Sequence, residues 1–348
     1  MTATGSGVSH NTSMKNNPAT VSYFRILSNV VSLYRRVQRQ EKWLHKQLPI
    51  ILADTVPDYQ QSFSPRDIKR ITKYWQLALN LVCENLYQLT GNKPDSGEHK
   101  RIILLSVFGP LFDDLFDDNI LHYEQIASLV AKPETYVPQT KTDLLVKKLY
   151  LALLEITPNR QLFIEQLQQV SYWQRASLKQ LNNTITEEEL YEITYKKSYY
   201  AILLFCAVLD HYPDQQVLEI LYPIAGLMQL TNDAFDVWKD VHNGVYTLPN
   251  LYLNFEQLQA RFLAEIALIN HKLWQLPYTV KNKQKFAITI HSLHAMGWIS
   301  LAQLRQVTAG ISSFEALTKL SRKALVCDMD SFEQKLKWLK YIHRFVNY

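Results

Sequence analysis

The chain has 348 residues, of which 47% are hydrophobic and 20% charged, a composition typical of a globular protein with a large buried core. Its formal net charge of +5 is only mildly positive, so it does not indicate a nucleic-acid-binding protein. The sequence has 9 glycines and no GxGxxG or GxxxxGK[ST] loop, which argues against dinucleotide-binding and P-loop proteins.

Cysteines and apolar runs bear on where the protein works. Cys83, Cys206 and Cys327 lie far apart without CxxC spacing, so we expect core thiols in a reducing compartment, with no disulfide framework or zinc site. Residues 1–20 are polar and small, and we expect them to be a disordered N-terminal segment, not a secretion signal. The longest apolar run, 201–209, is too short to cross a bilayer. We therefore expect a cytoplasmic protein without a transmembrane segment.

Helical patterning runs through most of the chain. Apolar residues recur at spacings of three and four, whereas strand-like alternation is hard to find. Helix starts are indicated where a capping residue precedes proline or glutamates, at Ser64-Pro65, Thr157-Pro158 and Thr186. The predicted helices span 22–46, 65–90, 98–131, 140–155, 158–182, 187–211 and 214–242, followed by three or four more.

Short connections join these helices, and no internal repeat of solenoid type is found. We therefore predict one all-α domain over residues 21–348. Its long helices with broad apolar faces favour a single large antiparallel helical bundle. In such bundles, sites are built from side chains on facing helices around a central cavity.

Basic residues are densest on the first predicted helix. They are Arg25, Arg35, Arg36, Arg39, Lys42 and Lys46. A solvated helix face explains this pattern more simply than a membrane or nucleic-acid patch.

A first acidic cluster occupies six positions of the predicted helix 98–131. Its members are Asp113, Asp114, Asp117 and Asp118. At 100° per residue they share one arc, opposite a set of Leu and Phe side chains. Like charges four residues apart repel by about 0.2–0.5 kcal/mol, and no Lys or Arg occurs within residues 102–131. The pattern is compatible with a solvated face and with a Mg²⁺ site, since Mg²⁺ is held by carboxylates together with substrate phosphates.

A second polar cluster lies on the predicted helix 214–242. Helical spacing of four places three oxygen-bearing side chains on one stripe, those of Asn232, Asp236 and Asp240. Phe235 is expected to point away from this stripe, and Lys239 is placed where it could reach a phosphate oxygen beside a metal. Two such clusters in apolar sequence favour a metal site over a solvated face.

These clusters resemble the metal motifs of class I isoprenoid synthases. DDLFD at 113–117 is similar to the DDxxD motif of that superfamily. NDAFDVWKD at 232–240 resembles the NDxxSxxKE motif of class I terpene synthases, with Asp in the place of Ser and of Glu. The same region also resembles the FQxxDDxxD motif of trans-prenyltransferases, and GVYTLP at 244–249 follows it where that family has GKxTLP.

The resemblance implies the class I isoprenoid synthase fold, a prenyl diphosphate substrate and three Mg²⁺ ions, with Mn²⁺ as an alternative. The implied metal ligands are Asp113, Asp114, Asp117, Asp118, Asn232, Asp236 and Asp240. Of the overlapping pairs in the first motif, Asp113 with Asp117 is expected to face the metal. The implied catalytic residues are Asp113, Asp117, Asn232, Asp236 and Asp240. The implied diphosphate-binding residues are Lys197, Lys239 and Arg175, of which Lys197 resembles the lysine of the Lys-Thr stretch of trans-prenyltransferases.

From this resemblance we expect a terpene synthase that ionises one prenyl diphosphate and cyclises the carbocation or quenches it with water. Chain elongation is disfavoured because the GGKRxRP and RRGxPT loops are missing and Val245 replaces the lysine of GKxTLP. Condensation of the squalene or phytoene synthase type stays open, since both clusters also fit DxxxD pairs.

Readings from other classes also stay open. A ferritin-like bundle would need ExxH pairs, which are absent. A non-catalytic helical interaction protein predicts no dependence on metal. For every reading we expect a monomer or homodimer and no nucleic-acid partner.

Overall fold

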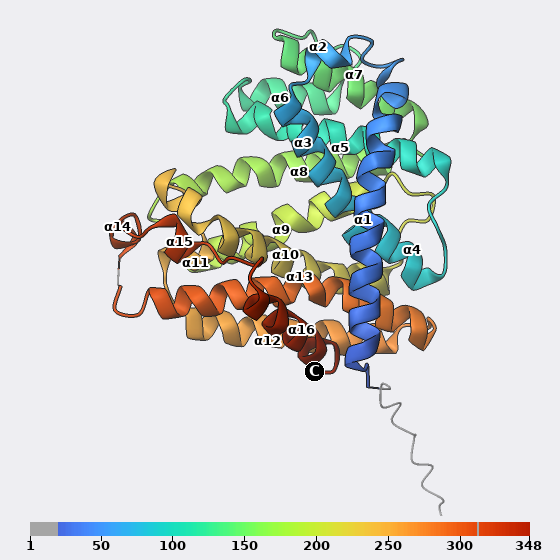
Figure 1. Cartoon of the computed structure of the whole chain (residues 1–348). Coiled ribbons are helices and arrows are strands. Elements are labelled where there is room, and N and C mark those ends of the chain that lie inside the picture. Colours follow the sequence, from blue (N-terminus) through green and yellow to red (C-terminus); the bar gives the residue numbers. More distant parts are fainter. Residues whose placement is uncertain (1–19, 312) are drawn as a thin grey trace, which may run out of the picture.

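The computed structural model describes residues 20–311 and 313–348. Within these ranges the fold is all-α: the helices pack as a bundle, and no strand occurs (Figure 1). All but the last residue of the predicted disordered segment lies outside the described residues. Among the described helices, none has the length and apolar character that a membrane span requires. The cytoplasmic location and the single domain over residues 21–348 stay predictions.

In chain order the described helices are α1 (Tyr23–Leu52), α2 (Tyr59–Ser62), α3 (Pro65–Leu77), the π-helical η1 (Ala78–Cys83), α4 (Glu84–Thr90), α5 (Ser96–Asp117), α6 (Tyr123–Ala131), α7 (Lys141–Ile156), α8 (Arg160–Ala176), the 3₁₀-helical η2 (Ser177–Leu181), α9 (Glu187–Cys206), α10 (Gln215–His242), α11 (Leu248–Leu251), α12 (Phe255–Gln275), α13 (Val280–Val307), α14 (Phe314–Leu317), α15 (Arg322–Leu325) and α16 (Phe332–Val346).

Two of the three predicted helix starts are confirmed by their caps. The Ser64 side chain accepts a hydrogen bond from the backbone N–H of Asp67 at the start of α3, and Thr186 caps α9 in the same way. The third prediction is wrong by two residues, because Thr157 ends α7 and Asn159 caps α8. An asparagine side chain can accept from the first-turn N–H groups as well as a threonine can.

The predicted helix 98–131 is wrong in the middle. It ends at Asp117, and α6 begins only at Tyr123. Asn119 lies in the left-handed region with φ +50°, a conformation that asparagine tolerates better than most residues and that commonly ends helices. Asp118 is therefore the C-cap of α5, and its exposed side chain does not continue the helical arc of the other three aspartates.

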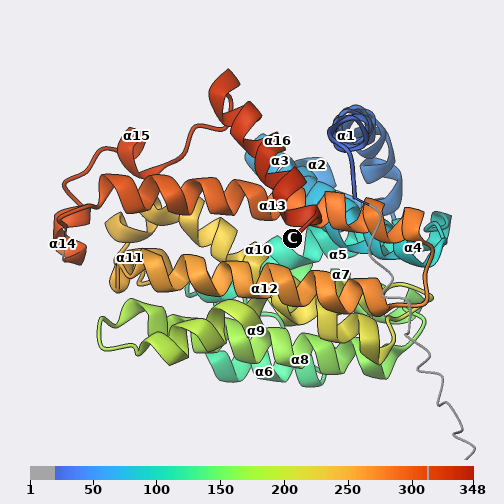
Figure 2. The ribbon, with the colours of Figure 1, turned by 90° about the horizontal axis from the view of Figure 1, so that it is seen from below.

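The centre of the bundle is formed where α10 packs against α9, α12 and α13, while α5 packs against α3 and α7. Figure 2 shows α12 and α13 running alongside each other. The crossing of α10 and α13 is close because Gly297 has no side chain: a Cβ there would lie 2.2 Å from the Thr231 hydroxyl oxygen. The predicted helix 65–90 is interrupted by the wider turn of η1, a feature that often marks functional sites.

Candidate functional site

A cavity of about 460 Å³ lies among α3, η1, α5, α8, α9, α10 and α13. Most of its wall is apolar, and the larger contributors include Leu81, Leu105, Phe108, Phe112, Phe205 and Phe235. Phe235 thus faces the cavity together with Asn232, contrary to the expectation that it points away. Such a cavity, with a few polar groups on an apolar wall, has the composition of a small-molecule site.

Members of both acidic motifs line this cavity. Asp113 reaches it from α5, Asn232 from α10 and Lys197 from α9. The Lys197 charge acts to lower the pKa of Asp113 on one helix and of Asp233 and Asp240 on the other. The fold therefore brings one predicted ligand of each motif, Asp113 and Asn232, to one cavity that Lys197 also lines.

The four aspartates of the first motif have different partners. Only Asp113 lines the cavity. Asp114 forms a two-pronged ion pair with Arg70 of α3, at 2.8 and 2.9 Å. Asp117 is exposed and accepts a hydrogen bond of 3.1 Å from the Gln174 side-chain amide.

Arg70 was missed by sequence reasoning. No Lys or Arg occurs within residues 102–131, but a cation for the acidic cluster comes from α3, 44 positions before Asp114. Arg70 also donates to the backbone oxygen of Pro110 at 2.8 Å, which fixes it beside the motif. A bidentate arginine satisfies both oxygens of one carboxylate, so Asp114 is held away from the cavity while Asp113 is not.

Asp233 was also missed as a site residue. Its side chain is buried on α10, one oxygen accepts a hydrogen bond of 2.8 Å from Gln229, and the other has no partner among the described residues. Asp236 and Asp240 follow at i+3 and i+7 and are half-buried. This spacing, visible in the sequence, places Asp233 beside the predicted ligands. Buried carboxylate oxygens are rarely left without a partner.

Three carboxyl groups of these motifs hold their protons unusually tightly. Burial raises the pKa of Asp113 to about 6, with Lys197 opposing this and Asp117 adding to it. Burial raises the pKa of Asp233 to about 7. The pKa of Asp240 rises to about 8 because of burial and the charges of Asp233 and Asp236. Burial, more than repulsion between the aspartates, therefore disfavours the ionised form of these three carboxyl groups.

The predicted diphosphate-binding residues separate into two groups. Lys197 lines the cavity, and its ammonium donates to the Ser177 hydroxyl at 3.3 Å. Lys239 is exposed and close enough to Asp240 to lower its pKa. Arg175 is exposed and stacks over the Tyr123 ring at 3.8 Å from its centroid, outside the lining of the cavity. The last turn of α8 turns Gln174 towards the cavity and Arg175 away from it, and a role of Arg175 in diphosphate binding stays a prediction.

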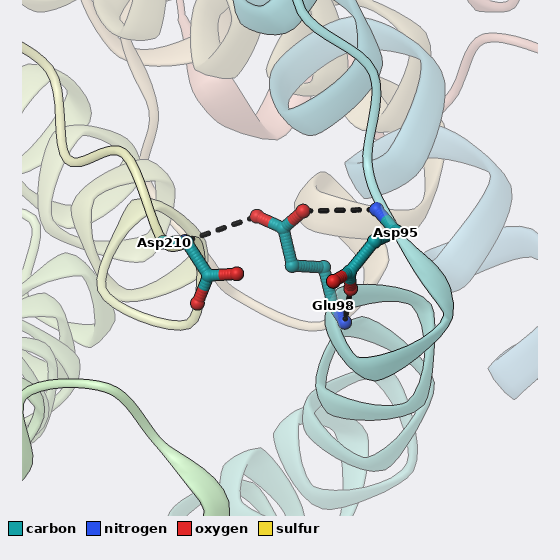
Figure 3. A group of neighbouring side chains, drawn as sticks. All are labelled: Asp95, Glu98 and Asp210. Carbon is teal, nitrogen blue, oxygen red and sulfur yellow. Dashed lines mark hydrogen bonds between the residues drawn. The ribbon is translucent and has the colours of Figure 1, made fainter.

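A third group of carboxylates occurs at the opposite end of α5. Asp95, Glu98 and Asp210 offer oxygens that lie within 4.8 Å of one another, close enough to hold a metal ion (Figure 3). Glu98 is buried and accepts hydrogen bonds from the Tyr87 hydroxyl and from the backbone N–H groups of Asp95 and Asp210, the last two at 2.9 Å. Asp210 forms an ion pair of 2.5 Å with Arg101.

This third group was not predicted, although the D-x-x-E spacing at 95–98 is a capping-box signal. Asp95 accepts from the Glu98 N–H, and Glu98 accepts in return, so the pair caps α5. The third residue, Asp210, belongs to the loop between α9 and α10 and could not be linked to the pair by spacing. The contacts explain the group as a cap that also fastens this loop.

Comparison with models of known protein families and with curated protein sequences gives no match to this chain. The resemblance to class I isoprenoid synthases therefore rests on the sequence motifs. Carboxylate and amide oxygens and a lysine in an apolar cavity are suited to bind a metal-complexed anion that carries an apolar group.

Proposed function

We propose that this chain is a Mg²⁺-dependent class I terpene synthase. In this proposal it ionises one prenyl diphosphate and cyclises the resulting carbocation or quenches it with water, releasing diphosphate. The all-α bundle would then be the class I isoprenoid synthase fold that the motifs imply.

One observation carries the proposal: Asp113, Lys197 and Asn232, from three helices, line the same apolar cavity. A prenyl diphosphate has a highly charged end and a long apolar end. It needs metal- and anion-binding groups next to an apolar space, and the lining of this cavity contains both.

The residues fit a hard divalent cation. Their donor atoms are oxygens, which Mg²⁺ prefers over nitrogen and sulfur. One buried oxygen of Asp233 has no partner among the described residues, and burial raises the pKa values of Asp113 and Asp240, so a bound cation would stabilise the ionised form of these carboxyl groups. Asp113 and Asp117 would hold Mg²⁺ on one side, and Asn232, Asp236 and Asp240 on the other. When bound, Mg²⁺ supplies charge that neutralises the diphosphate as a leaving group.

The protein's own side chains account for the remaining requirements. Lys197 adds a fixed positive charge that would bind the diphosphate and would still stabilise its negative charge when the bond to the prenyl group breaks. Phe108, Phe112 and Phe235 line the cavity and would exclude water from the carbocation. Their ring faces carry negative potential, which favours a cation over a neutral hydrocarbon.

The test is to incubate the full chain with Mg²⁺ and, in turn, geranyl, farnesyl and geranylgeranyl diphosphate, and to analyse extracts by gas chromatography with mass spectrometry. We expect a hydrocarbon or alcohol of one prenyl chain from at least one substrate, and none when a chelator is present. A product with the carbon count of two joined chains would replace this proposal with condensation, which the DxxxD spacing also fits. No product from any of the three would contradict the proposal.

A further inference from the structure

Helix α1 lies on the outside of the bundle and uses only part of its surface for packing. Its buried side chains are Ile26, Leu44, Leu48 and Leu52. Figure 1 shows α1 crossing the surface of the molecule, and Figure 2, in which it is viewed nearly end on, shows it at the margin. The opposite side of the helix therefore faces outward over its whole length.

The first half of this outward side is apolar. Phe24, Leu27, Val31 and Tyr34, which we call the apolar patch, follow the spacing i, i+3, i+7 and i+10 and so form one stripe. Phe24 is 81% exposed and Tyr34 64% exposed. Single exposed apolar residues are ordinary, but a continuous stripe of them usually marks an interaction site.

The second half of the same side is basic. Arg35, Arg39, Lys42 and Lys46, which we call the basic patch, follow the spacing i, i+4, i+7 and i+11 and are all exposed. None of the four forms an ion pair with a described residue. Glu41 is the one acidic residue of α1. The patch is thus an uncompensated row of positive charge.

Positive charge also gathers on the side of α1 that faces α4 and α13. Lys285 of α13 has a pKa lowered by burial and by the charges of Lys281, Arg25 and Arg36. Arg36 has an acidic partner, Glu84, at 2.9 Å. These cations add to the positive charge of α1 but lie on the other side of the helix from the apolar patch.

We propose that α1 docks this protein on an anionic phospholipid bilayer, with the apolar patch in the membrane interface and the basic patch among the lipid headgroups. An amphipathic helix lying in the interface buries its apolar side chains about 5–10 Å deep and gains further attraction from anionic lipids. A solvated face, favoured by the sequence alone, accounts for the basic patch but leaves the apolar patch unexplained. Docking on a bilayer does not depend on the proposed enzymatic function.

Other partners fit this surface less well. A nucleic acid would pair with the basic patch but leave Phe24 and Leu27 without apolar contacts. In a dimer through this surface, parallel α1 helices would place the two basic patches against each other. Antiparallel helices would place each basic patch against an apolar patch. An anionic bilayer matches both halves at once.

The experiment is sedimentation of the full chain with large unilamellar vesicles. Vesicles of phosphatidylcholine alone are compared with vesicles in which about a third of the lipid is phosphatidylglycerol. We expect binding to the second kind only, with release at about 0.5 M salt because headgroup attraction is screened. Arg35→Glu with Arg39→Glu and Lys42→Glu should weaken partitioning at least about a hundredfold. Phe24→Ser with Leu27→Ser should weaken it about tenfold.

A matched control reverses three exposed basic residues on another part of the surface, Lys319→Glu, Arg322→Glu and Lys323→Glu, and should leave binding within about twofold of the wild type. Circular dichroism and the unfolding midpoint of each variant verify that it is folded. The proposal is overturned if the wild type does not sediment, if both vesicle types bind equally, or if the control weakens binding as much. A dimer that Phe24→Ser with Leu27→Ser abolishes, without vesicle binding, would assign the surface to a second copy instead.

Discussion

The two ends of α5 both carry acidic groups, but their surroundings are opposite. At the N-terminal end, Glu98 accepts three hydrogen bonds from protein donors, and Asp210 is paired with Arg101. At the C-terminal end, the Asp113 carboxylate accepts no hydrogen bond from a described residue and has a pKa raised to about 6. By distance the first group could hold a metal ion. In the second, Arg70 pairs with Asp114 and Gln174 donates to Asp117, and only Asp113 is left without a hydrogen-bond donor among the described residues.

This difference teaches that closeness of carboxylates is a weak sign of a metal site. The number of donors around each oxygen is more informative, because a carboxylate that already accepts several hydrogen bonds has little need of a cation. The comparison predicts that changes at the C-terminal end cost activity and changes at the N-terminal end cost stability.

The largest effect is expected from Asp113→Ala combined with Asp117→Ala. Product formation should fall on the order of a thousandfold, since the diphosphate loses the charge stabilisation that one motif provides. The unfolding midpoint should stay the same or rise, because a poorly paired carboxylate is removed. Steady-state rates and thermal unfolding of the same samples check both parts. Retained activity would contradict the expectation that the aspartates at the C-terminal end of α5 are needed for catalysis.

Glu98→Ala should show the reverse pattern. Removing three hydrogen bonds to a buried carboxylate should lower the free energy of unfolding by about 3 kcal/mol. Activity per folded molecule, measured well below the unfolding transition, should be unchanged. Urea denaturation gives the first quantity. An unchanged stability together with lost Mg²⁺ dependence would identify the N-terminal group as the metal site.

Lys197→Met tests whether the lysine that lines the cavity with Asp113 and Asn232 binds diphosphate. Affinity for diphosphate in the presence of Mg²⁺ should fall roughly tenfold to a hundredfold, because one buried charge-assisted contact is lost. Lys196→Met is the matched control: this neighbouring lysine pairs with Glu192 at 2.7 Å on the helix surface and should have little influence. Isothermal titration calorimetry measures both. If both variants lost the same affinity for diphosphate, Lys197 would not be a specific diphosphate-binding residue.

The smallest effect is expected in the pH dependence of metal-free stability. Asp113, Asp233 and Asp240 have pKa values raised to about 6, 7 and 8, so they favour the folded state while protonated. Their contribution is full below about pH 4 and is lost as the pH rises towards about 8. Asp240→Asn should therefore flatten the fall in stability between about pH 4 and 8 in chelator.

Histidines change stability in the opposite direction, which makes the difference between wild type and Asp240→Asn the informative quantity. Burial lowers the pKa of His291 to about 3 and that of His294 well below its usual range. These groups cost stability below about pH 6.5, where the unfolded chain binds protons that the folded chain does not. Urea denaturation at several pH values measures the curves. Parallel curves for the two proteins would show that Asp240 does not titrate as described.

The sequence was sufficient for those features that depend on local pattern. Apolar spacing and capping residues predicted an all-α fold and the starts of α3 and α9, and helical spacing grouped Asn232, Asp236 and Asp240. The break at Asn119 was missed because a single residue with positive φ interrupts no hydrophobic pattern. The helix start near Thr157 was misplaced because Asn159 is an equally good cap.

Features that depend on distant parts of the chain were beyond such reasoning. Arg70 pairs with Asp114, and Asp210 joins Glu98, through contacts that spacing along one helix does not reveal. The direction of Arg175 depends on how α8 is rotated against its neighbours, and the exposure of Phe24 depends on what α1 packs against. The meeting of the two motifs at one cavity was expected only through the resemblance to a known family.

The most direct test of the central claim is thermal unfolding of the full chain with Mg²⁺, with inorganic diphosphate, and with both. If the two motifs and Lys197 form one site for a metal-bound diphosphate, the pair should raise Tm well beyond the sum of the separate shifts. At a hundred times the dissociation constant the stabilisation is about 2.7 kcal/mol. The extra shift should vanish in Asp113→Ala with Asp236→Ala. The claim would be contradicted if Mg²⁺ and diphosphate together raised Tm by no more than the sum of their separate shifts. It would also be contradicted if the extra shift survived in the double variant.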